Sequence, residues 1–286
     1  MKTLLLSPFF ALLVAAAPAL ASPPADTLAK VTETGRFVIG FREDTRPFSY
    51  RDSDGNPAGY SVDLCQRIAT IVKEASGRDE LDVQYVPVDA ADRFSAVQSG
   101  EVDIMCEAVT DTLERRAEAD FTLHIFITGA EMLVKTDSGI GDISDLSGKK
   151  AGVLAGTTTE TAIREALKTQ MIDAEVTTFE EHGAGLAAVE DGTIDAYFAD
   201  RMLLLGLGQQ AKDAKTLQLS GRFYSYEPYA FMLRRGDDKL RLAADTALAN
   251  LYRTGQIWEI YRKHFGDAEP SELLVAMFIL NGIPEK

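Results

Sequence analysis

Residues 103–116 read DIMCEAVTDTLERR. A short apolar run ends here in small and hydroxyl residues. Asp111 and Glu114 have the spacing of a capping box, which predicts that a helix begins after Asp111 with Arg115 one turn inside it. The end of a strand, a polar turn, free N–H groups and a guanidinium would then converge, and together they suit the binding of a carboxylate. The simpler alternative is that Asp111 only caps the helix and Arg115 faces solvent.

A second stretch repeats the pattern that leads into this one. Residues 96–104 read AVQSGEVDI, and residues 188–196 read AVEDGTIDA. In both, a helix is expected to end at a glycine and a strand to follow, running into a polar turn at Thr110 and at Asp200. We interpret the pair as two similar α/β lobes, with chance similarity as the alternative. Because open α/β sheets bind ligands at the carboxyl ends of their strands, two facing lobes predict a binding cleft between them.

Strands and helices are expected to alternate over most of the chain. The expected strands are residues 36–41, 81–86, 102–105, 149–154, 175–179, 194–198 and 216–219, with extended segments at 121–127 and 130–135. Helices are expected at 92–98, 160–171, 182–191 and 200–210, another begins at Ser61, and the final third is helical at 239–252, 256–264 and 272–280. This alternation indicates an α/β fold with parallel sheets and crossover helices.

The N-terminus has the features of a secretory signal peptide. Lys2 precedes the apolar run Leu4–Ala17, and Ala19-Leu20-Ala21 forms an A-x-A cleavage site, so residues 1–21 are excluded from the fold. The run is shorter than the about 20 apolar residues that a membrane anchor needs, and no cysteine directly follows the cleavage site to carry a lipid. We expect an exported, soluble mature protein.

The composition argues against several classes of function. A formal net charge of −15 disfavours binding to nucleic acid or to anionic membranes. The two cysteines, Cys65 and Cys106, cannot form a zinc site alone, and no histidine cluster accompanies them. In an exported protein a disulfide between them is expected, with two separately buried thiols as the alternative. No metal or cofactor is predicted, and neither a P-loop nor a G-x-S-x-G motif is present.

Further polar residues stand where the expected strands end. Gly156–Glu160 is a polar turn in which Thr157 and Glu160 have capping-box spacing, and free N–H groups with hydroxyls there would suit a carboxylate. Asp200 ends a strand and is a natural acceptor for an ammonium group, besides capping the next helix. Taken singly, such residues are more often caps or solvated charges. Three further candidates follow strands or begin helices: Arg42, Arg93 and His182.

Three motifs together carry a family resemblance. They are RPFSY…GYSVDL in residues 46–64, SGEVDIMCEAVTDTLERRAEADFT in residues 99–122 and LSGKKAGVLAGTTTE in residues 146–160. From Arg36 to Phe265 the chain resembles the type II periplasmic solute-binding proteins of polar amino-acid ABC importers. Within that family it is most similar to glutamate/aspartate-binding members, through FREDTRPFSY with Arg42, DRFSAVQSG with Arg93 and EEHGAG with His182.

The resemblance implies a role for each candidate residue. Arg115 would pair with the α-carboxylate of the ligand, and Asp200 would bind its α-ammonium group. Three hydroxyl residues would assist Arg115: Thr110, Thr157 and Thr158. A side-chain carboxylate of the ligand would be surrounded by Arg42, Arg93 and His182. An acidic amino acid carries two anions and one cation, and this set of residues supplies several cations and one anion.

The chain departs from the resemblance at Glu107 and Ala108, where similar binders of acidic ligands tend to have Gly-Ser. Ala108 removes a hydroxyl group. We expect the side chain of Glu107 to be exposed to solvent. If it points inward instead, its carboxylate would disfavour an anionic ligand side chain and would favour glutamine, asparagine or a cationic amino acid.

The resemblance also implies a type II periplasmic-binding-protein fold with a hinge between its lobes. Lobe 1 would comprise residues 30–132 and 228–286 and lobe 2 residues 133–227, with the hinge near 130–135 and 226–231. The expected protein is a periplasmic monomer that captures a polar amino acid, foremost glutamate or aspartate, and delivers it to an ABC permease in the inner membrane. Two alternatives stay open. One is a cyclohexadienyl or arogenate dehydratase with Glu107 or His182 as general acid, and the other is a soluble sensor.

Overall fold

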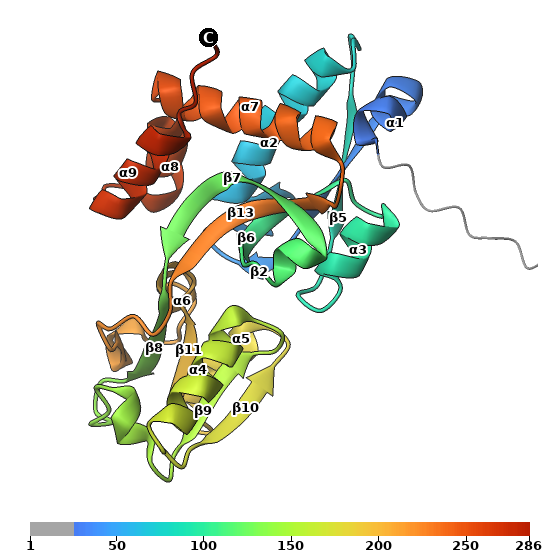
Figure 1. Ribbon diagram of the computed structural model, residues 1–286. Coiled ribbons are helices and arrows are strands. Elements are labelled where there is room, and N and C mark those ends of the chain that lie inside the picture. Colours follow the sequence, from blue (N-terminus) through green and yellow to red (C-terminus); the bar gives the residue numbers. More distant parts are fainter. Residues whose placement is uncertain (1–25) are drawn as a thin grey trace, which may run out of the picture.

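The computed structural model describes residues 26–286, and the predicted signal peptide lies outside this part of the chain. Two five-stranded sheets form the centres of two lobes in the described residues (Figure 1). The strand order of the first sheet is β5 (Asp82–Pro87), β1 (Arg36–Phe41), β6 (Ile104–Thr110), β13 (Glu227–Arg234) and β7 (Ala119–Thr128). The order of the second is β10 (Glu175–Phe179), β9 (Lys150–Leu154), β11 (Ala196–Asp200), β8 (Ala130–Lys135) and β12 (Leu217–Leu219).

The two sheets have the same arrangement of strand directions. In the first, β5, β1 and β6 are parallel, β13 runs antiparallel to β6, and β7 runs antiparallel to β13. In the second, β10, β9 and β11 are parallel, β8 runs antiparallel to β11, and β12 runs antiparallel to β8. The predicted repetition of an α/β unit is therefore confirmed, although each sheet is mixed rather than purely parallel.

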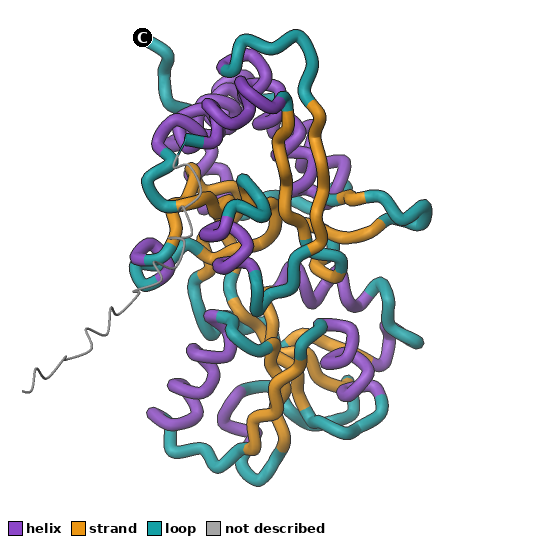
Figure 2. The backbone as a smooth tube through the Cα atoms, turned by 90° about the vertical axis from the view of Figure 1, so that its right-hand side faces the viewer, coloured by secondary structure: helices purple, strands orange, loops and turns teal. Residues whose placement is uncertain are grey.

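The chain crosses between the sheets twice. β7 leads through Gly129 into β8, and residues 220–226 lead from β12 back to β13. Residues 130–135, expected near the hinge, form β8 and are paired along the second sheet, so the boundary expected after residue 132 falls inside a strand. Figure 2, turned by 90°, shows the two lobes one above the other with the second lobe below.

Helices cover both faces of each sheet. One face of the first sheet packs against α1 (Thr27–Thr34), α2 (Tyr60–Ala75), α7 (Asp238–Thr254), α8 (Ile257–Phe265) and α9 (Glu272–Asn281), and the other against α3 (Arg93–Ser99). The second sheet lies between α4 (Thr158–Thr169) on one face and α5 (His182–Glu190) and α6 (Arg201–Gly208) on the other. A small three-stranded sheet of β2 (Asp44–Thr45), β3 (Ser49–Arg51) and β4 (Pro57–Ala58) follows β1. The predicted C-terminal helices are confirmed.

The spacing of apolar residues along the strands and helices explains these layers. Ile104 and Cys106 of β6 pack on the side of α2, whereas Met105 and Val109 pack on the side of α3, as alternation along a strand requires. Buried apolar residues of α2 recur at helical spacing, including Leu64, Ile68 and Val72. The first sheet is thus largely apolar on both faces, with Glu107 in the middle of β6 as a buried charged exception.

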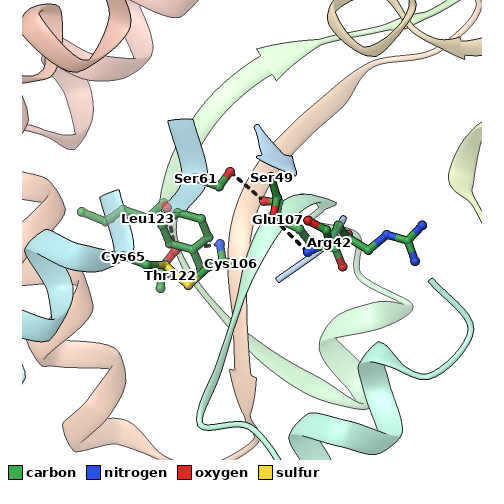
Figure 3. Close-up of a disulfide and its surroundings, with 9 residues drawn as sticks. Arg42, Ser49, Ser61, Cys65, Cys106, Glu107, Thr122 and Leu123 are labelled. Carbon is green, nitrogen blue, oxygen red and sulfur yellow. Dashed lines mark hydrogen bonds between the residues drawn. A yellow bond between two sulfur atoms is a disulfide. The ribbon is translucent and has the colours of Figure 1, made fainter. Parts of the chain in front are cut away.

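A disulfide joins α2 to β6. Cys65 and Cys106 are bonded, with their Cα atoms 6.3 Å apart, and both are buried (Figure 3). Cys106 and Glu107 are neighbours in β6, and Figure 3 shows their side chains on opposite sides of the strand, with Glu107 on the side of Arg42. The disulfide therefore ties down the strand that carries Glu107.

Removing the disulfide with the double substitution Cys65→Ala and Cys106→Ala is expected to lower the free energy of unfolding by about 2–4 kcal/mol, because the loop that it closes gains conformational freedom in the unfolded chain. Urea denaturation of the double variant and the wild type measures the difference. The wild-type protein unfolded under reducing conditions serves as the control and should shift in the same direction. Equal stability of variant and oxidised wild type would contradict the expectation.

Candidate functional site

A cavity lies where residues of the two lobes meet. All eight residues predicted to bind the ligand line it, and so do the two positions singled out as departures. These are Arg42, Arg93, Glu107, Ala108, Thr110, Arg115, Thr157, Thr158, His182 and Asp200. The structure thus brings together every residue that the sequence suggested for the site.

The two sheets deliver these residues from equivalent places. In the first lobe, Arg42 directly follows β1, Arg93 begins the helix after β5, and Thr110 ends β6. In the second, the loop after β9 leads into Thr157, and Asp200 ends β11. Carboxyl ends of parallel strands gather at one edge of a sheet, and here the two edges face a common cavity.

Arg115 lies in a different local structure from the one predicted. β6 continues to Thr110, and only a 3₁₀ turn over Arg115–Ala117 follows, so the predicted helix after Asp111 is wrong. Asp111 does not cap it; its carboxylate instead pairs with Arg116 at 2.6 Å and His124 at 3.0 Å. The backbone N–H of Arg115 donates to Thr112 Oγ1 at 3.1 Å, and its Nη1 donates to the Thr110 carbonyl at 2.9 Å. The guanidinium is therefore held against the end of β6 while it lines the cavity.

A helix N-terminus does face the cavity, but from the second lobe. Thr157 caps α4 by accepting from the Glu160 N–H at 3.1 Å, as its spacing predicted. The carboxylate of Glu160 accepts from the Gly156 N–H at 2.9 Å. Thr158 in the first turn lines the cavity with its hydroxyl directed across to the first lobe, 3.3 Å from Thr110 Oγ1. Both hydroxyls donate within the protein, Thr157 to the Leu154 carbonyl at 2.8 Å and Thr158 to Glu227 at 2.7 Å, so the turn offers an anion chiefly its backbone N–H groups.

Asp200 is a buried acceptor at the other side of the cavity. Its carboxylate accepts hydrogen bonds from Thr159 Oγ1 at 3.1 Å and from the Tyr229 hydroxyl. It precedes α6 but makes no capping hydrogen bond with its side chain, so the carboxylate is left for the cavity. Burial and then the nearby carboxylate of Glu227 raise the pKa of Asp200 above its usual range. Burial and Glu227 thus disfavour the ionised form of Asp200, and a ligand cation at this position would stabilise that form.

Glu227 does not line the cavity, but it holds two residues that do, and the sequence did not single it out. It begins β13, is 1% exposed, and accepts from the hydroxyls of Thr158 at 2.7 Å and Thr110 at 2.5 Å. One carboxylate of the first sheet thus binds a hydroxyl from each lobe. The sequence offered little signal, since a Glu before a proline after a polar loop resembles many surface residues.

The expectation that Glu107 is exposed is wrong. Its side chain is 3% exposed and lines the cavity, with Oε1 3.8 Å from Nη1 of Arg93. Strand alternation is the reason: Cys106 faces the disulfide and the core, so Glu107 must face the opposite side. The charge of Glu107 acts on Arg42, Arg93 and Arg115, and it partly offsets the lowering of the pKa of Arg115 to about 10, which burial and Arg93 cause.

Arg42 and His182 are also buried. Arg42 pairs with Asp44, with Nη2 2.6 Å from Oδ1, and lies 3.5 Å from Asp89. Nδ1 of His182 is 2.9 Å from the Tyr197 hydroxyl. Burial holds the pKa of His182 well below its usual range, despite Asp44, so its imidazole is neutral at neutral pH. His182 therefore contributes hydrogen bonding to the cavity rather than a positive charge.

The lobes touch each other around the cavity. Nη2 of Arg93 donates to the Gly156 carbonyl at 3.2 Å, and the His182 N–H donates to Asp44 at 3.3 Å. A Cβ atom at Gly206 would lie 2.2 Å from the Arg46 carbonyl oxygen, so only glycine lets α6 approach the hairpin of the first lobe this closely. The structure is therefore that of a closed pair of lobes.

No group of three or more histidine, cysteine or carboxylate side chains in residues 26–286 is arranged to hold a metal ion. No helix within this range is long and apolar enough to cross a membrane.

Residues 37–267 match the model of the bacterial extracellular solute-binding proteins, family 3. The chain belongs to this family. The L-glutamate/L-aspartate-binding protein of Pseudomonas aeruginosa is 34% identical over 255 residues, covering 89% of this chain and 84% of that protein. The ABC transporter glutamine-binding protein GlnH of Bacillus subtilis is 32% identical over 250 residues, covering 86% of this chain and 87% of that protein.

Solved structures agree with this assignment to family 3. An ancestral arginine-binding protein bound to glutamine has a TM-score of 0.73 and 28% identity, covering 82% of this chain and 99% of that one. An ancestral amino acid-binding protein described as a precursor of cyclohexadienyl dehydratase has a TM-score of 0.74 and 28% identity, covering 84% and 100%. The predicted two-lobed α/β fold is confirmed. The relatives named here are binding proteins rather than enzymes, which supports the same class for this family member.

Proposed function

We propose that this protein is the substrate-binding component of an ABC importer and captures a free amino acid by its α-ammonium and α-carboxylate groups. The observation that carries the proposal is the arrangement of Arg115 and Asp200. The guanidinium comes from the first lobe and the buried carboxylate from the second, and both line one cavity. Their opposite charges match the opposite charges of a zwitterionic amino acid. Thr110, Thr157 and Thr158 would assist at the carboxylate.

The side-chain end of the ligand would lie near Arg42, Arg93 and His182. Two relatives at about a third identity are named as binding glutamate and aspartate, from Pseudomonas aeruginosa and Escherichia coli, and another as binding glutamine. A polar amino acid is therefore the proposed ligand class. By these names, glutamate and aspartate are the first ligands to test.

Closure of the lobes would couple capture to transport. A ligand that contacts both lobes binds the closed form better than the open one, so it shifts the population toward closure. We place the hinge at the two chain crossings, Gly129 and residues 220–226, between a lobe of the first sheet and a lobe of the second. The closed monomer would then dock on a permease of the inner membrane. Export to the periplasm would rest on the signal peptide predicted in residues 1–21, outside the described part of the chain.

Titration calorimetry against the polar amino acids tests the proposal. After removal of any carried ligand by unfolding and refolding, we expect saturable one-to-one binding of at least one of them. At a ligand concentration 100 times the Kd, the same ligand should raise the free energy of unfolding by about 2.7 kcal/mol. The D-enantiomer is the control, because it cannot place its two α-groups and its side chain in the same three positions at once. Failure of every polar amino acid to bind would refute the proposal.

A further inference from the structure

The side-chain end of the cavity contains a negative charge that an acidic ligand would have to face. Glu107 lines the cavity and is 2% exposed as a residue. Its position is fixed from behind, since Cys106 is disulfide-bonded to α2 and Ser61 Oγ donates to the Glu107 carbonyl at 3.2 Å (Figure 3). The strand therefore cannot readily turn this carboxylate away from the cavity.

The positive charges at this end are already offset before any ligand enters. Arg42 is paired with Asp44 at 2.6 Å and lies 3.5 Å from the exposed Asp89, and Arg93 lies 3.8 Å from Glu107. His182 adds no positive charge at neutral pH. Two guanidinium groups thus face three carboxylates, so a further anion would gain little and would meet Glu107. A further cation would equally meet Arg42 and Arg93.

Two polar atoms in this group lack partners. Among the described residues, Nε of Arg93 has no acceptor and Oε1 of Glu107 has no donor, although both atoms are buried. Unpaired buried polar atoms are costly and are usually satisfied in a functional complex. What is missing here is one hydrogen-bond acceptor for the arginine and one donor for the glutamate, from a group without net charge.

We infer that the cavity selects an amino acid with a side-chain carboxamide, glutamine or asparagine, and that Glu107 is the residue that determines this choice. A carboxamide carries one acceptor oxygen and an NH₂ donor on the same carbon. Its oxygen would accept from Arg93 and its NH₂ group would donate to Glu107. A carboxylate can only accept, so it would leave Oε1 of Glu107 unpaired and would add a like charge beside it. This inference rests on the proposed function, because it presumes that the α-groups are held by Arg115 and Asp200.

Competition between amide and acid ligands tests the inference. Calorimetry on the ligand-free wild-type protein at pH 7.5 should show glutamine or asparagine binding at least about tenfold more tightly than the corresponding acid, because like charges side by side are strongly disfavoured. In Glu107→Gln the negative charge is lost at nearly constant shape. We expect the ratio of amide to acid affinity to fall by about tenfold or more in this variant. Glu101→Gln, an equal change of charge at an exposed position of the same lobe, should keep the wild-type ratio.

The other possible results contradict either the inference alone or the proposed function as well. Tighter binding of glutamate or aspartate by the wild type would overturn the inference and leave the proposed function intact. Tighter binding of lysine or arginine would do the same. Absence of binding to any amino acid would overturn both. Should Glu107→Gln fail to fold, the wild-type ratio decides alone, because it needs no variant.

Discussion

Replacing Arg115 with alanine is expected to weaken the binding of every amino acid that the protein accepts by about 100-fold to several thousand-fold. The reason is that the ligand α-carboxylate would enter a cavity that no longer offers its main cation. Arg93 cannot take over this role, since it lies beside Glu107 and donates to the Gly156 carbonyl. Because the α-carboxylate is common to all amino acids, the loss should be equal for amide and acid ligands. Calorimetry with the preferred ligand measures it.

Two neighbouring substitutions control for this result. Arg116→Ala removes the adjacent arginine, whose side chain is half exposed and pairs with Asp111, and it should leave the affinity unchanged. Arg115→Lys should restore only part of the affinity, because an ammonium group cannot form the paired hydrogen bonds of a guanidinium. Near wild-type binding by Arg115→Ala, with the fold intact by circular dichroism, would show that the carboxylate is held elsewhere.

The second large effect is expected at Asp200. Asp200→Asn keeps the shape of the side chain but removes the charge that would pair with the ligand ammonium group. Losing one partner of a buried charged pair costs about 2–5 kcal/mol of binding free energy, so the affinity should fall by about 30-fold to several thousand-fold. Thr159 provides a matched comparison, since its hydroxyl only supports the Asp200 carboxylate at 3.1 Å and Thr159→Val should cost less. Unchanged affinity in Asp200→Asn would place the ammonium group at another carboxylate.

The affinity should also depend on pH through Asp200. Its pKa in the empty protein is raised above the usual range by burial and by Glu227. A bound ammonium group favours the ionised carboxylate, so ligand binding should release a proton as the pH falls toward and below that raised pKa. The wild-type affinity is therefore expected to decrease as the pH is lowered through the raised pKa, and Asp200→Asn should lose this dependence. Calorimetry in buffers of different ionisation enthalpy measures the released proton.

The stability of the empty protein should change with pH in the opposite direction to the ligand affinity. A carboxyl group whose folded-state pKa exceeds its unfolded value binds more protons when folded between those two values. Its contribution to stability is therefore fully present below the unfolded pKa and is lost as the pH rises through the raised pKa. Acidification from neutral pH would thus weaken ligand binding while this one group stabilises the empty fold. A wild-type affinity that is flat from pH 8 to pH 5 would argue against the role of Asp200.

Much of the architecture was predictable from the order of residues. The repeat of residues 96–104 at 188–196 indicated two lobes, and the structure has two sheets with the same strand order and directions. The predicted ends of that repeat, Thr110 and Asp200, are the last residues of β6 and β11. Both features follow from local periodicity and from the rule that strand ends carry function. The amino-acid sequence alone is therefore enough to predict them.

Local rules failed where packing decided the outcome. The spacing of Asp111 and Glu114 favoured a helix, yet Asp111 is engaged by Arg116 and by His124 of β7, and only a 3₁₀ turn forms. Capping preferences are worth about 1 kcal/mol, which ion pairs and strand pairing to β13 can outweigh. Glu227 was missed for a similar reason, since its partners, Thr110 and Thr158, are distant in sequence.

The sequence by itself therefore determined the two-lobed α/β fold and most of the residues that gather at its cleft, because hydrophobic period and strand-end chemistry are local properties. The tertiary structure decided that Glu227 joins them and which way Glu107 faces. That direction follows from the disulfide of Cys106 with α2, which assigns one side of β6 to the core and the next residue to the cavity. The balance of charge around a ligand side chain depends on such juxtapositions, and no spacing rule along the chain contains them.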